Sequence, residues 1–208
     1  MRFIRSKAWP AGLAMLAAVA VVAGCAGETA TPASPGASPA IPGARAAPYS
    51  IETIKSNLPA DFQIQVYRGA NTLGGDRVDL SQVVAQGKPV ALNFFAGLCP
   101  PCRAEIPDLQ EVHNRLGDRF TLVGVDVGPF TGLGTNDDGL ELIEDLDVTF
   151  PTGSTPSRDV VNRYRILGMP STVFITPDGK VLRKWDGALS QSKLEELVQQ
   201  LITAASSS

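Results

Sequence analysis

Residues 90–107 read VALNFFAGLCPPCRAEIP, and this stretch decides the fold. Its first part, 90–95, is apolar apart from Asn93, which predicts a strand buried in the middle of a sheet. From Pro100 to Leu116, apolar residues recur at helical spacing. The two cysteines of the stretch therefore stand where a buried strand passes into a helix.

The spacing of Cys99 and Cys102 brings both sulfurs onto one helical turn, close enough to form a disulfide. Cys99 falls at the start of the helix, where unpaired backbone N–H groups and the helix dipole favour a thiolate. Proline suits the first turn that follows, because its missing N–H would have no partner there. This pattern predicts thiol–disulfide exchange, in which one cysteine attacks a substrate disulfide and the other resolves the mixed disulfide.

Two other uses of the pair are open from the sequence. A static disulfide is one, although it would close a very short loop and constrain the unfolded chain little. A zinc site is the other, but it needs two more ligands, and the chain offers only Cys25 and His113 in addition. We therefore expect a redox pair with no metal and no cofactor.

The first 24 residues predict an export signal. Arg2, Arg5 and Lys7 precede an apolar run over 11–22, and the run ends in VAGC, which resembles a bacterial lipobox. We expect a lipoprotein signal peptide over 1–24 and lipid attachment at Cys25. An ordinary signal peptide or an uncleaved anchor are the alternatives. With Cys25 acylated, one closed cysteine pair remains.

Residues 25–48 are rich in Pro, Ala and Ser and predict an extended tether, followed by a folded domain over 49–205. The net charge is −3; without residues 1–24, which hold three of the 18 basic residues, 15 basic and 21 acidic residues remain, a net charge of −6. No basic stripe is present, so nucleic acid is not an expected partner.

The domain alternates strands and helices, which predicts an α/β fold with a mixed sheet and helices on both faces. Beyond the opening stretch, we expect strands over 61–67, 120–127, 148–150, 171–176 and 181–185. We expect helices over 80–86, over 140–146 with Asp138 as cap, over 157–166, and a last helix with a capping box of Ser192 and Glu195. The glycine-rich segment 128–139 is expected to be a surface loop.

Three motifs in order carry a family resemblance: the stretch from Asn93 to Pro107, GMPSTVFI at 168–175, and PDGK at 177–180. They resemble the TlpA/ResA-type extracytoplasmic thiol–disulfide oxidoreductases over about residues 57–203. The resemblance implies a thioredoxin-like fold with an extra central βα insertion. It also implies a cis-proline at Pro170 and substrate binding by the Met169 backbone and by Pro100 and Pro101.

The same resemblance makes Cys99 the nucleophile and Cys102 the resolving thiol, with Glu105 assisting proton transfer. An exposed carboxylate favoured by the helix dipole is the alternative for Glu105. Asn93 stands near the buried aspartate of cytoplasmic thioredoxins, so Glu105 is the expected nearby acid.

The implied function is reduction of disulfides in exported proteins, with apocytochromes c among the candidates, by a lipid-anchored protein on the outer side of the bacterial cell membrane. Electrons would come from a membrane donor such as a thiol reductant carrier. A disulfide-forming oxidase is the nearest alternative. A peroxiredoxin would need threonine where Ala96 stands. A tethered binding lipoprotein without redox activity is the non-enzymatic alternative.

We predict that Cys25→Ser releases the protein from membranes and leaves disulfide exchange in vitro unchanged, because the lipid site and the redox pair belong to separate segments. Membrane fractionation, with the parent as control, measures the first effect. A variant that stays in the membrane fraction would reject acylation as the anchor.

Overall fold

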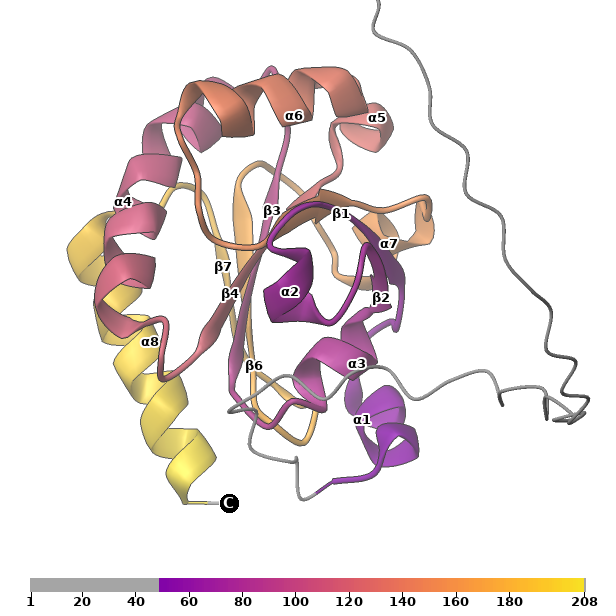
Figure 1. Ribbon diagram of the computed structural model, residues 1–208, viewed down its shortest axis with the longest axis vertical. Helices are drawn as coiled ribbons and strands as arrows, with labels where there is room; N and C mark the ends of the chain where they lie inside the picture. Colours follow the sequence, from indigo (N-terminus) through magenta and orange to yellow (C-terminus); the bar gives the residue numbers. More distant parts are fainter. Residues whose placement is uncertain (1–48, 208) are drawn as a thin grey trace, which may run out of the picture. The chain divides into compact units, whose positions relative to one another are not determined.

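The computed structural model describes residues 49–207, which form a mixed sheet of seven strands (Figure 1). β3 pairs in parallel with β4, and β4 with β5, whereas all other neighbours are antiparallel. In sheet order the strands are β2 (Arg77–Asp79), β1 (Gln63–Arg68), β5 (Thr152–Ser154), β4 (Thr121–Asp126), β3 (Val90–Phe95), β6 (Ser171–Ile175) and β7 (Val181–Asp186).

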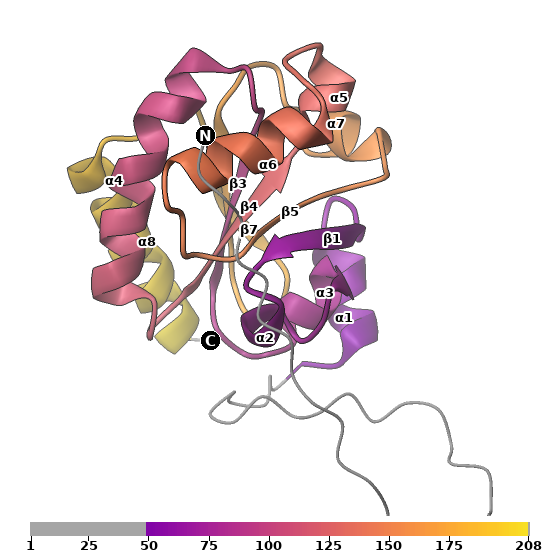
Figure 2. The same ribbon diagram turned by 45° about the horizontal axis from the view of Figure 1, so that its top comes forward.

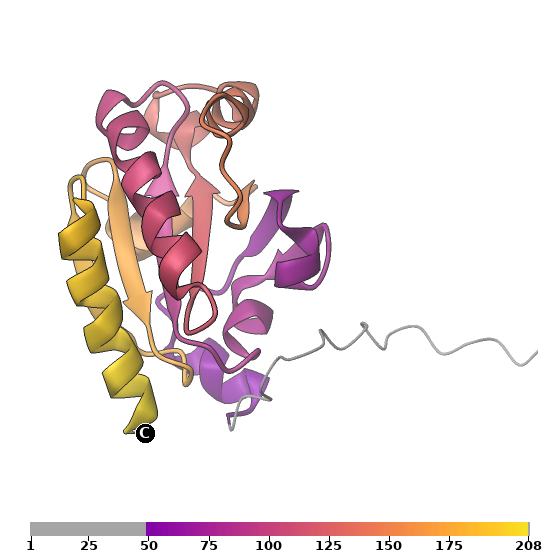
Figure 3. The ribbon, with the colours of Figure 1, turned by 60° about the vertical axis from the view of Figure 1, so that its left-hand side comes forward.

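Helices cover both faces of this sheet (Figure 3). One face carries α1 (Ile51–Asn57), α2 (Ala70–Leu73), α3 (Leu80–Val84) and α7 (Asp159–Arg163). The other carries α4 (Pro100–Leu116), α6 (Asn136–Asp145) and α8 (Gln191–Ser206), with α4 and α8 side by side (Figure 2). The short α5 (Gly128–Thr131) follows β4. None of the helices within 49–207 is long and apolar enough to cross a membrane.

The centre of the sheet is β3, all of whose side chains are buried. On one face, Phe94 packs against Tyr164 with ring centroids 5.3 Å apart, and Phe62 meets the same tyrosine edge-on at 5.9 Å. The Tyr164 hydroxyl donates to the Ala60 carbonyl at 2.7 Å, which satisfies the polar end of this aromatic cluster. β3 therefore has little freedom to change register, since a shift by one residue would turn Phe94 away from this aromatic cluster.

The register of β3 and β6 defines two ends of the domain. Phe94 lies opposite Ser171 at one end, and Val90 lies opposite Ile175 at the other. The cysteines follow β3, and Pro170 precedes β6, so both belong to the first end. The opposite end carries the turn between β6 and β7.

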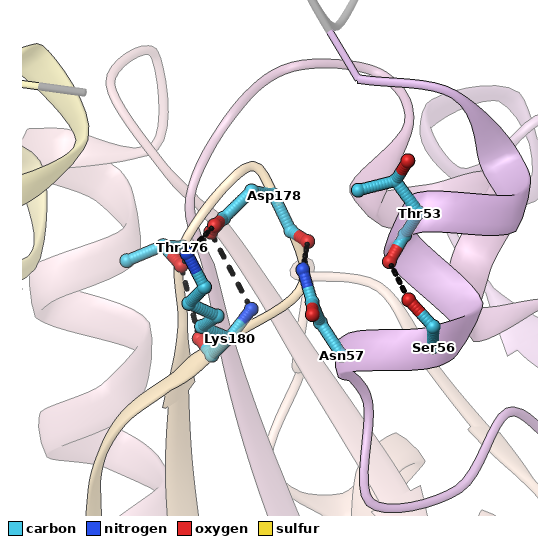
Figure 4. Close-up of polar contacts among 6 residues, drawn as sticks. All are labelled: Thr53, Ser56, Asn57, Thr176, Asp178 and Lys180. Atoms are coloured by element: carbon cyan, nitrogen blue, oxygen red, sulfur yellow. Dashed lines mark hydrogen bonds and ion pairs between the residues drawn. The ribbon is translucent and has the colours of Figure 1, made fainter.

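Helix α1 packs on that turn, as Figure 4 shows. The Asn57 side chain donates to the Asp178 carbonyl at 2.8 Å, and the Thr176 hydroxyl donates to the Asp178 carboxylate at 2.5 Å. Lys180 forms an ion pair with the same carboxylate at 2.7 Å. The PDGK motif thus builds a hydrogen-bonded turn that holds α1 far from the cysteines.

The expected α/β class and thioredoxin-like architecture are confirmed, and the bounds of β3 and α4 agree with the sequence prediction. The extra insertion is the segment of α5, α6 and β5 between β4 and α7. The prediction missed α1, α2 and β2, and the expected loop over 128–139 contains α5 and the first turn of α6.

Several predicted boundaries were wrong. The strand expected over 148–150 does not form there. Val148 and Phe150 are buried in the core, but they pair with no other strand. The strand β5 begins only after Pro151. Helix α7 is shorter than 157–166 and is followed by Arg165 in the left-handed region. The predicted signal peptide, the predicted lipid site at Cys25 and the predicted tether lie outside the described residues.

Two predicted helix caps were also wrong. Thr135 caps α6, and Asp138 is its partner in a capping box. Ser190 caps α8, two residues before the expected cap Ser192. In both cases several residues near the helix start could serve as a cap, and packing of the helix decides among them.

Candidate active site

Cys99 and Cys102 form a disulfide with their Cα atoms 5.3 Å apart. Cys99 ends the loop after β3, and Cys102 lies in the first turn of α4. Only 2% of Cys99 and 1% of Cys102 is exposed, and both pack into the core cluster under α4 and α8. The pair is thus attached directly to the most buried strand of the domain.

Cys99 is the N-cap residue of α4, and this position polarises its sulfur. Its backbone is extended, and its Sγ accepts the Cys102 N–H at 3.3 Å. Pro100 and Pro101 have no N–H, so Cys102 supplies the first N–H group of the helix. In the reduced protein, the same N–H and the positive end of the helix would stabilise a thiolate on Cys99.

Glu105 lies one turn after Cys102 and is buried, with only 2% of the residue exposed. Its Oε1 accepts from the Asn93 side chain at 2.7 Å, and its Oε2 accepts the Leu189 N–H at 2.5 Å. Asn93 also donates to the Thr172 hydroxyl at 3.0 Å. The alternative of an exposed surface carboxylate is therefore wrong, and Asn93 is a direct hydrogen-bond partner of Glu105.

Burial raises the pKa of Glu105 from its ordinary value of 4.5 to about 7. The hydrogen bonds from Leu189 and Asn93 oppose this shift, and the nearby Asp108 adds to it. A carboxyl group that titrates near neutral pH can both accept and return a proton. Glu105 shares one face of α4 with Cys102, since residues three apart are neighbours on a helix.

The loop before β6 completes this end of the domain. The Met169–Pro170 peptide bond is cis, as the resemblance implied, and Pro170 is buried whereas Met169 is partly buried. Pairing of β6 with both neighbours starts at Ser171, so the Met169 backbone lies outside these ladders. Two large apolar side chains are exposed beside these segments, Leu98 at 61% and Leu167 at 91%.

Residues 57–184 match the model of the AhpC/TSA family. The chain belongs to this family. The thiol-disulfide oxidoreductase ResA of Oceanobacillus iheyensis is 33% identical over 135 residues, which are 65% of this chain and 66% of that protein. The chain thus spans about two thirds of the length of this curated relative.

Two solved structures are similar in fold to this chain. A thiol:disulfide interchange protein, DsbE, from Chlorobium tepidum matches with a TM-score of 0.55 and 27% identity over 72% of this chain and 95% of that one. The exposed lipoprotein thioredoxin Etrx1 of Streptococcus pneumoniae matches with a TM-score of 0.57 and 25% identity over 68% and 99%. The disulfide and the similarity to these proteins show that the chain is a thiol–disulfide oxidoreductase.

Sequence reasoning missed three groups at this site. Thr172 and the Leu189 N–H complete the network around Asn93 and Glu105. Asp126 is a second fully buried carboxylate, at the end of β4, and burial raises its pKa to about 6. An acid that ends an otherwise apolar strand was the one signal that could have drawn attention to it. His113 is half-buried, and its ring meets that of Phe150 edge-on.

We predict that the free energy of unfolding of the oxidised protein falls with rising pH more steeply than that of Glu105→Gln. A raised carboxyl pKa favours the protonated form in the fold, so this stabilisation is complete below pH 4.5 and is lost as the pH rises through about 7. The difference between the two curves should reach up to roughly 3 kcal/mol. Urea titrations from pH 4 to 8 measure it, and parallel curves would contradict a raised pKa.

We also predict that, in the reduced protein at pH 7, iodoacetamide modifies Cys99 about tenfold or more faster than Cys102, because only Cys99 occupies the cap position. Peptide mass mapping after brief treatment measures both rates. In urea the two cysteines should react alike, which provides the control. Faster labelling of Cys102 would reverse the assigned roles.

Proposed function

We propose that the chain reduces disulfides in exported proteins, with Cys99 as nucleophile and Cys102 as resolving thiol. The observation that carries the proposal is the disulfide at the start of α4 beside the buried Glu105. The cap position stabilises a thiolate on Cys99, and thiolate stabilisation sets how readily the pair exchanges. The relatives named above are thiol–disulfide exchange proteins, which supports the same reaction.

The reaction starts from the reduced pair. The Cys99 thiolate attacks one sulfur of the client disulfide, a mixed disulfide forms, and the other client sulfur leaves as a thiolate. Cys102 then attacks the Cys99 sulfur of the mixed disulfide, the client is released with two thiols, and the Cys99–Cys102 disulfide forms. Two electrons pass from the pair to the client, so an external donor must restore the dithiol; a membrane thiol carrier would fit this role.

Glu105 is proposed to take the proton from Cys102 when that thiol becomes the attacking group. Its position one turn further along α4 and its pKa of about 7 support the proposal. Asn93 and the Leu189 N–H hold both carboxylate oxygens, so the group is fixed in place when it changes charge. A glutamine at this position would keep much of the shape but could not accept the proton.

Client binding is proposed at the surface formed by Pro100, Pro101 and the Met169 backbone. Met169 lies just beyond the β6 ladders, and an extended client segment could pair with its backbone there. The exposed side chains of Leu98 and Leu167 add apolar contact area for such a segment.

The place of action is proposed to be the extracytoplasmic side of the bacterial cell membrane, with lipid on Cys25. The lipobox-like end of the signal segment supports this, as does the similarity to a pneumococcal lipoprotein. Apocytochromes c remain candidates among the exported clients. Oxidation of clients is the second candidate, because the same pair could run in the opposite direction.

The reduction potential of the pair decides the direction. Equilibration with glutathione buffers should give a value below about −230 mV, in the range of reducing thioredoxin-like pairs. A value above about −180 mV would instead assign the chain to disulfide formation.

Client trapping tests the assigned roles of the cysteines. Cys102→Ser should accumulate DTT-sensitive adducts with exported proteins on Cys99, because the mixed disulfide can no longer be resolved. Cys99→Ser is the matched control and should form few or none. Equal adducts on both variants would refute Cys99 as the nucleophile.

A further inference from the structure

Asp126 is a fully buried carboxylate that the proposed reaction does not use. It ends β4 in register with Phe95, four residues before Cys99. Its Oδ1 accepts the Gly128 N–H at 2.8 Å, and its Oδ2 accepts the Tyr67 hydroxyl at 3.3 Å. The carboxylate is therefore held in one orientation at the same end of the sheet as the redox pair.

The first turn of α6 lies between this carboxylate and the loop that leads to Cys99. A Cβ added to Gly139 would stand 2.2 Å from the Asp126 Oδ2. On the other side, a Cβ added to Gly97 would stand 2.3 Å from the carbonyl carbon of Asp138. The backbone at 138–139 thus packs against the carboxylate on one side and against the redox loop on the other, with no space for a side chain at either contact.

The redox loop makes a further contact with the same inserted segment. The Leu98 N–H donates to the Leu133 carbonyl at 2.8 Å, and Gly134 packs against the Leu98 side chain. The two residues that precede Cys99 therefore rest on the segment 133–139. A shift of this segment would move the two residues that precede Cys99, whose sulfur accepts the Cys102 N–H.

Burial of the Asp126 carboxylate at this place lowers the stability of the fold. The groups that face it are the Tyr67 hydroxyl on β1 and the Asp138 carboxylate on α6, and among residues 49–207 no cation forms an ion pair with it. Burial of an ionised group without a cation opposes folding. Carboxyl groups with strongly raised pKa values, as burial gives Asp126, cluster at functional sites.

We propose that Asp126 is a positioning residue of the redox site: its carboxylate fixes the first turn of α6, and that turn fixes residues 97–98 and the sulfur of Cys99. The inserted segment, which is an addition to the minimal thioredoxin fold, then acts as the support of the redox loop. Asp126 does so by contact, and its charge is not required.

The test measures the rate at which iodoacetamide modifies Cys99 in the reduced full chain at pH 7. Asp126→Ala removes the contact and should slow the reaction about fivefold or more, because the displaced sulfur loses the Cys102 N–H. Asp126→Asn keeps the shape without the charge and should stay within about twofold of the parent. Asp137→Asn, an exposed charge on the same turn of α6, is the matched control and should have no effect.

A size swap tests the contact from the other side. Gly139→Ala should also slow the modification of Cys99 by iodoacetamide, although alanine normally stabilises a helix interior relative to glycine. The double variant Asp126→Ala/Gly139→Ala should restore the rate to within about twofold, because the new methyl group occupies the space of the lost carboxylate. Circular dichroism and urea unfolding follow each variant.

The proposal is overturned if Asp126→Ala reacts like the parent, if Asp126→Asn is as slow as Asp126→Ala, or if the double variant shows no recovery. Should a single variant fail to fold, recovery of folding and of Cys99 reactivity in the double variant supports the contact, and failure of that recovery rejects it. Iodoacetamide needs neither client nor electron donor, so this test can fail while the proposed reductase function stands.

Discussion

The burial of β3 in the middle of the sheet is the constraint on which the redox site depends. All of its side chains are buried, and it has paired strands on both sides. A slip by one residue would exchange the faces to which Asn93 and Phe94 point, and would break their contacts with Glu105 and Tyr164. The end of β3 is therefore fixed, and with it the start of α4 and the cap position of Cys99.

The same buried frame holds the polar groups of the site. Asn93 points from β3 to Glu105, and Asp126 ends the neighbouring strand under α6. Both carboxyl groups have raised pKa values because burial disfavours their charged forms. The same end of the domain thus holds two buried acids, Glu105 one turn along α4 from Cys102 and Asp126 against the first turn of α6.

The two ends of the sheet have separate roles. The end that carries the cysteines, the cis-proline loop and α6 has exposed apolar side chains and a reactive disulfide. The opposite end carries α1 and the hydrogen-bonded turn at Asp178. Within residues 49–207, helix α1 at this opposite end contacts the turn through Asn57.

The sequence by itself determined the parts whose signals are local. The apolar run predicted β3, the spacing of apolar residues predicted α4, and the CxxC pair predicted the redox chemistry. These signals are local because the periodicity of apolar residues and helix capping involve residues only a few positions apart. The strand expected over 148–150 failed because an apolar run indicates burial and not pairing. Only the tertiary structure decided the environment of the acids. Glu105 is buried and accepts hydrogen bonds from Asn93 and from Leu189, which lies 84 positions away, and Asp126 packs against Gly139 of α6. Burial of a carboxylate depends on what the rest of the chain packs around it, and no local pattern contains that information.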